Sequence, residues 1–388
     1  MTSIRIAQLS TSSVGGAAIA ASRLSDELNK REVGSELIHS RQRSTNAIKD
    51  LNSKIVTGFQ RALTRELYGI ATPLSLSKVD RDLLLRKFDV LHIHNWYNLL
   101  SLEDLQYLGS RAPIMFTMHD ERLLTGGCHT TLGCKNFMRD CNPCPAVFIG
   151  QSHVSRSKRL LSETLFRLPV FSVITPSRWM QEQWQLANPN FAHLVNYIPN
   201  IIDYPIRRRF AFDPSSILKI VFISADISTP VKGLSTLLNA LAKFDLYSKV
   251  SVDLVGRIDV KSAPSHARVK LYGGLSSQKV FQVMRQSHLL VVPSLSENSP
   301  NVIAEAQLLG LPVLASNVGG NSELIEHGVT GFLAEPNEDS IGSALSRLVE
   351  KPNFREISEN AIGSAESRWD NSRNALSHID LYQKAISS

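Results

Sequence analysis

Short apolar runs alternate with amphipathic stretches along most of this chain of 388 residues. Runs rich in Val, Ile and Leu that alternate with helical patterns are typical of parallel strands buried on both faces. The strands predicted in the first half are Ile4–Leu9, Ser35–His39, Val90–His94, Ile114–Met118 and Val170–Thr175. Those predicted in the second half are Leu218–Ile223, Val250–Val255, Val269–Tyr272, Leu289–Val292 and Pro312–Ala315. The pattern therefore predicts an α/β fold with parallel sheets.

The alternation breaks once, around residues 197–214, where prolines accompany the basic run Arg207–Arg209. We interpret this stretch as a linker, because 388 residues exceed what one hydrophobic core usually organises. We expect one Rossmann-like domain over residues 1–205 and a second over residues 206–367. Residues 368–388 have helical character, and this C-terminal helix could belong to either domain; we place it against the first.

Composition narrows the class of protein. Hydrophobic residues make up 43% of the chain and charged residues 20%, which excludes disordered and collagen-like chains. No apolar run approaches the ~18 residues that a spanning helix needs. Residues 1–21 also lack the continuous apolar stretch of a cleaved signal peptide. Four cysteines are too few for a secreted disulfide framework, so we expect a cytoplasmic protein.

The net charge of +7 comes from the first half of the chain. The first 200 residues hold 23 Lys and Arg against 16 Asp and Glu, whereas residues 201–388 are balanced. Basic amphipathic stretches lie at residues 41–65 and 153–167. Such stretches suit an anionic membrane surface on the cytoplasmic side, although a solvated helix face explains them as well.

Polar residues follow the predicted strand Leu289–Val292, and ligands of open α/β sheets bind beyond such strand ends. Ser299 and Asn301 are candidate N-caps for a helix at residues 302–309, whose first N–H groups would suit a phosphate. Glu297 and Glu305 flank this helix start, and carboxylates accept hydrogen bonds from paired sugar hydroxyls. Either glutamate alone is also typical of an ordinary solvated helix start.

Glycine-containing motifs follow other strands. Lys232-Gly233 follows Leu218–Ile223, where a lysine can direct its charge toward the same edge of the sheet. Gly319-Gly320 follows Pro312–Ala315 and would let the backbone approach a ligand closely. Gly15-Gly16 follows the first strand, but the dinucleotide motif G-x-G-x-x-G is absent. Each of these motifs alone is weak evidence for a ligand site.

Candidate chemistry in the first half lies after two predicted strands. His119 follows Ile114–Met118 and could act as a general base or bind a sugar hydroxyl, although a buried core histidine is equally typical. The candidates for an acceptor pocket are His94, Asn95, Trp96 and Asp120.

The four cysteines of the chain fall within 17 residues. They are Cys128, Cys134, Cys141 and Cys144. Four thiolates satisfy tetrahedral zinc, and the last pair resembles a zinc-knuckle turn, whereas the spacing of the first pair is atypical. A structural zinc, two local disulfides and reduced buried thiols are the alternatives.

The motifs together resemble those of the family-four glycosyltransferases, which are retaining enzymes of the GT-B fold. The matching elements are the E-x7-E pair Glu297 and Glu305, Gly310–Val313, Gly319–Glu323, Thr330–Leu333, Lys232-Gly233, Ile198–Asp203 and Thr175–Ser177. The segment Thr125–His129 with the cysteines resembles a subgroup that builds bacterial surface polysaccharides.

The resemblance implies two Rossmann-like domains facing each other across a cleft, the first for the acceptor and the second for a nucleotide-sugar. It implies transfer of a hexose, with retention, to a saccharide or lipid-linked saccharide, without a catalytic metal or a nucleic-acid partner. Its catalytic residues would be Glu297, His119 and Lys232. Its donor-binding residues would be Lys232, Glu297, Asn298, Ser299, Asn301, Val302, Glu305, Gly15 and Gly16.

One departure from the family pattern concerns a cation. The family usually carries an arginine a few residues before the lysine, whereas Ser224–Pro230 contains none. Arg257 or Arg178 would have to replace it at the donor diphosphate. The alternative functions are a non-transferring GT-B enzyme, such as a sugar-nucleotide epimerase, and a zinc-bearing protein that binds glycans or nucleic acid.

Overall fold

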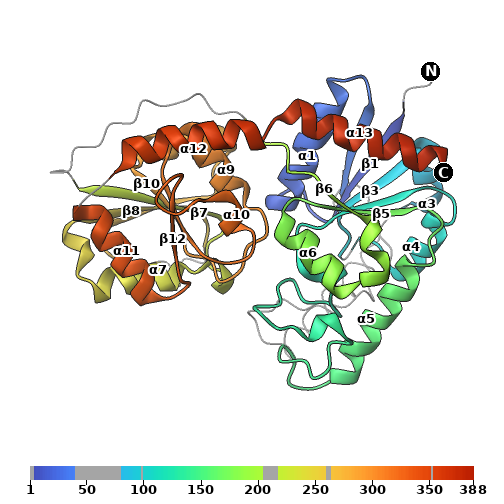
Figure 1. The fold of residues 1–388 in the computed structure, drawn as a ribbon, viewed down its shortest axis with the longest axis horizontal. Helices are drawn as coiled ribbons and strands as arrows, with labels where there is room; N and C mark the ends of the chain where they lie inside the picture. The colour runs from blue at the N-terminus through green and yellow to red at the C-terminus, as the bar shows by residue number, and fades with distance from the viewer. Residues whose placement is uncertain (1–3, 40–79, 98, 204–216, 259–263, 351–352) are drawn as a thin grey trace. The chain divides into compact units, whose positions relative to one another are not determined.

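The computed structural model describes residues 4–39, 80–97, 99–203, 217–258, 264–350 and 353–388. The chain divides into two compact units (Figure 1). The first unit comprises Met1–Ile201 and Asn371–Ser388, and the second comprises Ile202–Asp370. These divisions lie three or four residues from the expected ones at 205/206 and 367/368. The basic stretch at residues 41–65 lies outside the described residues.

The described part of the first unit contains a six-stranded parallel sheet with the order β2-β1-β3-β4-β5-β6. Its strands are β1 (Arg5–Ser10), β2 (Gly34–His39), β3 (Val90–Asn95), β4 (Ile114–Thr117), β5 (Phe171–Thr175) and β6 (Val195–Tyr197). Its α-helices are α1 (Gly16–Asn29), α3 (Arg81–Lys87), α4 (Leu102–Gly109), α5 (Gln151–Leu165), α6 (Arg178–Ala187) and α13 (Asn371–Ser387). Short 3-10 helices are η3 (Glu121–Leu123), η4 (Asn136–Met138) and η5 (Pro189–Leu194).

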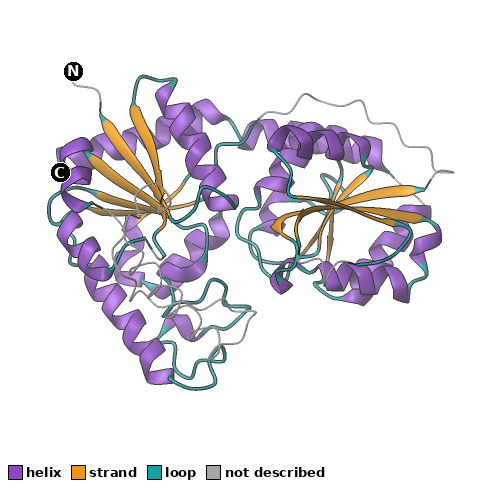
Figure 2. Cartoon of the chain, turned by 180° about the vertical axis from the view of Figure 1, so that it is seen from behind, coloured by secondary structure: helices purple, strands orange, loops and turns teal. Residues whose placement is uncertain are grey.

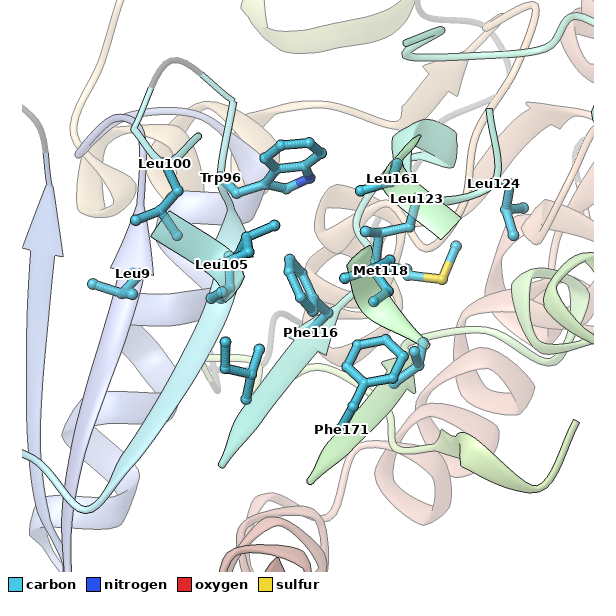
Figure 3. Close-up of a cluster of buried hydrophobic side chains, with 14 of the residues drawn as sticks. Leu9, Trp96, Leu100, Leu105, Phe116, Met118, Leu123, Leu124, Leu161 and Phe171 are labelled. Carbon is cyan, nitrogen blue, oxygen red and sulfur yellow. The ribbon is translucent and has the colours of Figure 1, made fainter. Parts of the chain in front are cut away.

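Helices cover both faces of this sheet (Figure 2). Because successive strand residues point to opposite faces, Ile6 and Met115 pack with α1 and α13, whereas Leu9 and Phe116 pack with the helices of the other face. Figure 3 shows the second of these clusters, with Phe116 and Phe171 among the leucines. The helix α13 thus packs on α1 and β3, although it follows the second unit in the sequence.

The described part of the second unit contains another six-stranded parallel sheet, with the order β12-β11-β10-β7-β8-β9. Its strands are β7 (Leu218–Asp226), β8 (Val250–Arg257), β9 (Val269–Gly273), β10 (Leu289–Val292), β11 (Val313–Ser316) and β12 (Phe332–Ala334). Its α-helices are α7 (Leu234–Lys243), α8 (Ser277–Gln286), α9 (Asn301–Leu309), α10 (Asn321–Leu324), α11 (Glu338–Glu350) and α12 (Phe354–Arg368). The 3-10 helices are η6 (Pro230–Lys232) and η7 (Leu246–Ser248). Side chains of α7 and α11 pack on one face of the sheet, and those of α8, α9 and α12 on the other.

The predicted α/β class with two parallel sheets is confirmed. Each of the ten predicted strands corresponds to a strand of the structure, with ends that differ by a few residues. The strands β6 and β12 were not predicted, because three residues at a sheet edge leave little alternation to detect. In the part of the chain that the structure describes, no helix has the length and apolar character required to span a bilayer.

Candidate functional site

The second sheet has a topological switch point between β7 and β10. These neighbouring strands are paired in parallel, with Leu289 of β10 opposite Ile220 of β7. The chain continues from β7 to β8 on one side and from β10 to β11 on the other. The connections therefore leave in opposite directions and open a crevice at the carboxyl ends, where ligands of such sheets bind.

Lys232 and Glu297 meet at this switch point. Lys232 ends η6, which follows β7, and Glu297 lies in the loop after β10. The Lys232 Nζ donates a hydrogen bond to Glu297 Oε1 at 2.7 Å, and the Ser294 hydroxyl donates to the same oxygen at 2.8 Å. The Glu297 side chain is 11% exposed and that of Lys232 32% exposed. The structure thus joins two of the predicted catalytic residues and adds Ser294, which was not predicted from the sequence.

Two glycines allow neighbouring loops to pack against the Glu297 loop. Gly233 has a φ of +75°, and a Cβ there would lie 1.9 Å from the carbonyl oxygen of Pro293. Gly319 has a φ of +52°, and a Cβ there would lie 1.8 Å from the carbonyl oxygen of Glu297. The Gly320 N–H also donates to that oxygen at 3.2 Å. The glycine motifs therefore shape the loop that holds Glu297, a role that their sequence pattern did not indicate.

The helix α9 begins one residue earlier than predicted, and neither candidate N-cap caps it. Its N-cap is Pro300, with no side-chain hydrogen bond, and Asn301 is already the first helical residue. Proline favours the extended φ of a cap but has no side-chain oxygen to offer. The N-cap residue therefore offers no side-chain acceptor to the first turn, whose N–H groups carry the positive end of the helix dipole. The predicted donor residues Asn298, Ser299, Val302 and Glu305 lie in and around this turn and are buried or half-buried.

The two candidate replacements for the missing arginine lie in different units. Arg257 is the last residue of β8, and its Nε donates to the carbonyl oxygen of Ala225 at 3.3 Å. Since Ala225 lies near the end of β7, Arg257 lies at the same sheet edge as Lys232. Arg178 begins α6 of the first unit and lies over the ring of Tyr197. Of these two arginines, only Arg257 belongs to the second unit, in which the donor diphosphate is expected to bind.

The first sheet has its own switch point between β1 and β3. Gly15 follows β1, has a φ of +96° and caps the N-terminus of α1. A Cβ added to Gly15 or to Gly16 would have no atom within 4 Å, so the space beside both glycines is open. The Thr11 hydroxyl lies 3.0 Å from the backbone oxygen of Asn95, at the end of β3. The predicted residues Gly15, Gly16 and Asn95 therefore share one edge of the sheet.

His119 is held by His94. The Nε2 of His119 lies 2.9 Å from the Nδ1 of His94, and the Nε2 of His94 lies 2.7 Å from the Oε1 of Gln8. Burial lowers the pKa of His119 to about 4, and burial with the neighbouring His92 holds the pKa of His94 well below its usual range. Both rings are therefore neutral near neutral pH. Gln8 was not predicted, although a glutamine within an apolar strand is a detectable signal.

Trp96 and Asp120, two of the residues predicted for the acceptor pocket, have contacts within the first unit. Trp96 is 5% exposed and packs in the hydrophobic cluster of Figure 3, which leaves little of the ring for a ligand. Asp120 Oδ1 accepts a hydrogen bond from the Arg122 N–H at 2.9 Å, and its Oδ2 pairs with Arg122 and His129. Burial would raise the pKa of Asp120, but the Arg122 guanidinium and the hydrogen bond with His129 hold that pKa well below its usual range. Its carboxylate is thus engaged within the first unit.

The four cysteines lie in the loops between β4 and α5 and are free thiols. Within the described ranges, no three His, Cys, Asp or Glu side chains are grouped as metal ligands are. A structural zinc at these thiols stays a prediction, which elemental analysis of the purified protein tests.

Comparison with known proteins shows what the chain is similar to. Residues 218–351 match the model for glycosyl transferases group 1. An uncharacterized glycosyltransferase of Methanocaldococcus jannaschii is 23% identical over 326 residues, which cover 77% of this chain and 76% of that protein. A UDP-Gal:alpha-D-GlcNAc-diphosphoundecaprenol alpha-1,3-galactosyltransferase of Escherichia coli is 39% identical over 79 residues, 20% of each chain.

The whole fold is similar to that of HepE from Anabaena, solved in complex with UDP. The similarity has a TM-score of 0.64 at 19% sequence identity and covers 99% of this chain and 100% of that one. HepE has also been solved with UDP-glucose and with UDP and glucose. The matched motifs and the family match in the second unit fit a glycosyltransferase of the family-four type, and the architecture shared with HepE is the GT-B fold.

Proposed function

We propose that the chain transfers a hexose from a nucleotide-sugar to a saccharide or lipid-linked saccharide acceptor in polysaccharide biosynthesis. The observation that carries this proposal is the pairing of Lys232 with Glu297 at the switch point of the second sheet, beside the N-terminus of α9. A cation and a set of backbone N–H groups suit a diphosphate, and a carboxylate suits sugar hydroxyls. The UDP-glucose bound to HepE and the saccharide-lipid acceptor of the Escherichia coli relative support the same substrate classes.

In the proposed complex, the first turn of α9 and Lys232 hold the diphosphate, with Arg257 beside them. Glu305 binds the ribose, and Glu297 binds the hexose near its anomeric carbon. When the diphosphate binds, the Lys232 ammonium is shared between phosphate oxygen and Glu297. This arrangement would place positive charge where negative charge develops on the leaving group, which is the main requirement for stabilising the transition state.

Transfer is proposed to proceed with retention and without a catalytic metal. The acceptor hydroxyl oxygen forms its bond to the anomeric carbon on the face from which the diphosphate departs. The bond from that carbon to the β-phosphate oxygen breaks, and the β-phosphate takes the hydroxyl proton. The products are the glycoside and a nucleoside diphosphate. His119 of the first unit would bind a saccharide hydroxyl, and Gly15-Gly16 would face phosphate.

The proposal is tested first by nucleotide-sugar binding and then by product analysis. A thermal-shift panel of UDP-, GDP-, ADP- and dTDP-sugars should identify one donor class that stabilises the protein. With that donor, a glycosylated acceptor together with nucleoside diphosphate indicates transfer, whereas an altered nucleotide-sugar alone would indicate an epimerase. Absence of stabilisation by every nucleotide-sugar would contradict the proposal.

We also propose that the protein acts at the cytoplasmic face of an anionic membrane, where a lipid-linked acceptor would lie. Phe148 and Ile149 are 65% and 70% exposed and precede Gly150, the N-cap of α5. The solvent-facing side of α5 carries Arg156 and Arg159, which also line a shallow pocket of about 560 Å³. Lys158 instead turns inward and donates to the carbonyl oxygens of Phe137 and Arg139.

Exposed apolar side chains beside exposed arginines suit contact with a bilayer surface better than they suit a helix face that only contacts water. Burial of an apolar side chain in the interface contributes about 1.5–3 kcal/mol, and each arginine near an anionic surface adds about 1 kcal/mol. Neither Arg156 nor Arg159 forms an ion pair with another residue of the described part of the chain, so both charges remain available to phosphate headgroups.

A further inference from the structure

A group of four histidines lies on one face of the first sheet, near its carboxyl edge. His92 and His94 belong to β3, His119 follows β4 and His378 belongs to α13. The ring centroids of His92 and His94 are 4.3 Å apart, those of His94 and His119 are 5.2 Å apart, and those of His92 and His378 are 5.6 Å apart. Burial lowers the pKa of every ring, to about 4 for His119 and about 3 for His378. Each neutral imidazole then has one N–H donor and one lone-pair acceptor.

The amide nitrogen of Gln8 faces two hydroxyl groups in the structure. Its Nε2 donates to the Ser35 hydroxyl at 3.2 Å and to the Tyr382 hydroxyl at 3.5 Å. Tyr382 belongs to α13, and its hydroxyl also lies 2.7 Å from the Nδ1 of His92. With the amide nitrogen on that side, the carbonyl oxygen Oε1 of Gln8 lies toward His94.

The orientation of Gln8 determines which nitrogens carry protons. A carbonyl oxygen only accepts hydrogen bonds, so the Nε2 of His94, 2.7 Å from Gln8 Oε1, must be the protonated nitrogen. The Nδ1 of neutral His94 is then an acceptor. Its neighbour at 2.9 Å, the Nε2 of His119, must donate. The remaining nitrogen of His119, Nδ1, therefore carries a lone pair.

We propose that Gln8, acting through His94, is a positioning residue that fixes His119 as its Nε2–H tautomer and so makes His119 Nδ1 a hydrogen-bond acceptor for a saccharide hydroxyl. The structure gives this nitrogen no hydrogen-bond partner among the described residues. A ring in the other tautomer would present an N–H there and would favour a ligand carbonyl or phosphate oxygen instead. The saccharide in this proposal rests on the proposed function, whereas the tautomer does not.

The tautomer is measured directly by long-range 1H–15N correlation spectra of protein labelled at histidine nitrogen, because protonated and unprotonated ring nitrogens resonate far apart. A His119→Gln variant assigns the His119 signals by their loss. We expect wild-type His119 to be protonated at Nε2 and unprotonated at Nδ1 near neutral pH. Protonation at Nδ1 would show that the Gln8 amide faces the other way and would overturn the proposal.

Two pairs of variants test the role of the relay. His94→Asn keeps an acceptor oxygen close to the position of Nδ1, so the Nε2–H tautomer should persist, whereas His94→Phe removes the acceptor and should give a mixture. Gln8→Met frees His94 to adopt either tautomer and should also give a mixture at His119. An unchanged single tautomer in both His94→Phe and Gln8→Met would overturn the relay.

Activity gives an independent readout once the donor is known. Gln8→Met should lower kcat/KM tenfold or more, and His94→Asn should retain more activity than His94→Phe. Thr164→Val is a matched control, because it removes a different, part-buried hydrogen bond of the first unit, to the carbonyl oxygen of Leu160 at 2.8 Å. If Gln8→Met has a mixed tautomer and wild-type kcat/KM, the claimed effect of the tautomer on transfer is refuted. If no transfer is detected in any protein, the proposed function is refuted, but the tautomer can still be measured.

Discussion

Lys232 Nζ lies 2.7 Å from Glu297 Oε1, and the two residues follow neighbouring strands on opposite sides of the switch point in the second sheet. The lysine approaches from the β7 side and the glutamate from the β10 side, so neither strand alone creates the pair. A bound diphosphate would compete with the glutamate for the ammonium group. The pair therefore connects recognition of the phosphate to the position of the carboxylate.

Glu297→Gln and Lys232→Ala should each lower kcat by about 10²–10³-fold, which is the usual effect of removing one group that stabilises transition-state charge. Glu297→Gln retains the size of the side chain and can still accept a hydrogen bond from Lys232. Initial rates with the donor found in the binding panel measure the effect, and circular dichroism verifies folding.

The second unit offers a matched control for these variants. Lys243 and Asp339 form another ion pair, at 2.7 Å, on the exposed surface. Lys243→Ala removes the same type of side chain from that pair and should leave kcat near the wild-type value. Equal losses in Lys243→Ala and Lys232→Ala would contradict a specific role for Lys232.

Gly319→Ala should displace the Glu297 loop. The new Cβ would lie 1.8 Å from the carbonyl oxygen of Glu297, and the positive φ adds about 1–2 kcal/mol of strain. We expect a lower free energy of unfolding together with weaker stabilisation by the nucleotide-sugar. Urea unfolding and thermal shift measure the two effects.

Gly328→Ala tests the backbone strain alone, without the close contact that the new Cβ of Gly319→Ala makes with the Glu297 carbonyl oxygen. Gly328 has a φ of +77°, yet no atom lies within 4 Å of the position that a Cβ would occupy. This variant should therefore show the strain alone and should bind the donor as the wild type does. Loss of donor binding in both variants to the same extent would argue against the proposed role of Gly319.

The strands that hold the site could be predicted, but their neighbours could not. Glu297 and Lys232 each follow a clear apolar run, so the sequence alone predicts that both lie beyond strand ends. Their contact depends on β7 lying beside β10, which is a property of strand order and not of local alternation. The family resemblance supplied that order, since the residue pattern alone specifies only the elements.

The relay behind His119 could be predicted only in part. The alternation in Val90–Asn95 places His92 and His94 on one face of a strand, and this follows from the sequence. Gln8 and Tyr382 are 374 positions apart, and they meet because α13 packs against the first unit after the chain has formed the second. Helical periodicity predicted the helix but could not decide which unit it would join.

Acid should destabilise the first unit through its buried histidines. Burial lowers the pKa of His119 from 6.5 to about 4 and that of His378 from 6.5 to about 3. Above pH 6.5 these rings are neutral in both the folded and the unfolded chain, so they do not change stability. As the pH falls from 6.5 toward 4, the unfolded chain binds protons that the folded chain excludes, and the free energy of unfolding decreases.

Urea unfolding at about pH 7 and about pH 5 measures this effect, which amounts to about 1.4 kcal/mol for each unit of pKa difference that is traversed. His378→Gln removes one of the titrating groups and should make the decrease smaller. His266→Gln, at an exposed position of the second unit, should leave the decrease unchanged. An equal loss of stability in wild type and His378→Gln would contradict the contribution of His378.

The proposed membrane surface predicts two separable contributions to vesicle binding. Phe148→Ser with Ile149→Ser removes apolar insertion and should weaken binding at every salt concentration. Arg156→Ser with Arg159→Ser removes attraction to headgroups, and its effect should diminish as salt screens the anionic surface. Co-flotation with phosphatidylcholine vesicles, with and without phosphatidylglycerol, measures both effects, and wild-type binding should require the anionic lipid.

Leu186→Ser is the matched control for the apolar pair. Leu186 is 55% exposed on α6 of the same unit, so it presents a similar apolar surface at a different place. If exposed apolar area alone caused association with vesicles, Leu186→Ser would weaken flotation as the Phe148 and Ile149 changes do. If the surface beside α5 is the membrane contact, Leu186→Ser should float with wild-type affinity. Flotation of wild type that is equal on neutral and anionic vesicles would show that Arg156 and Arg159 do not recognise headgroups.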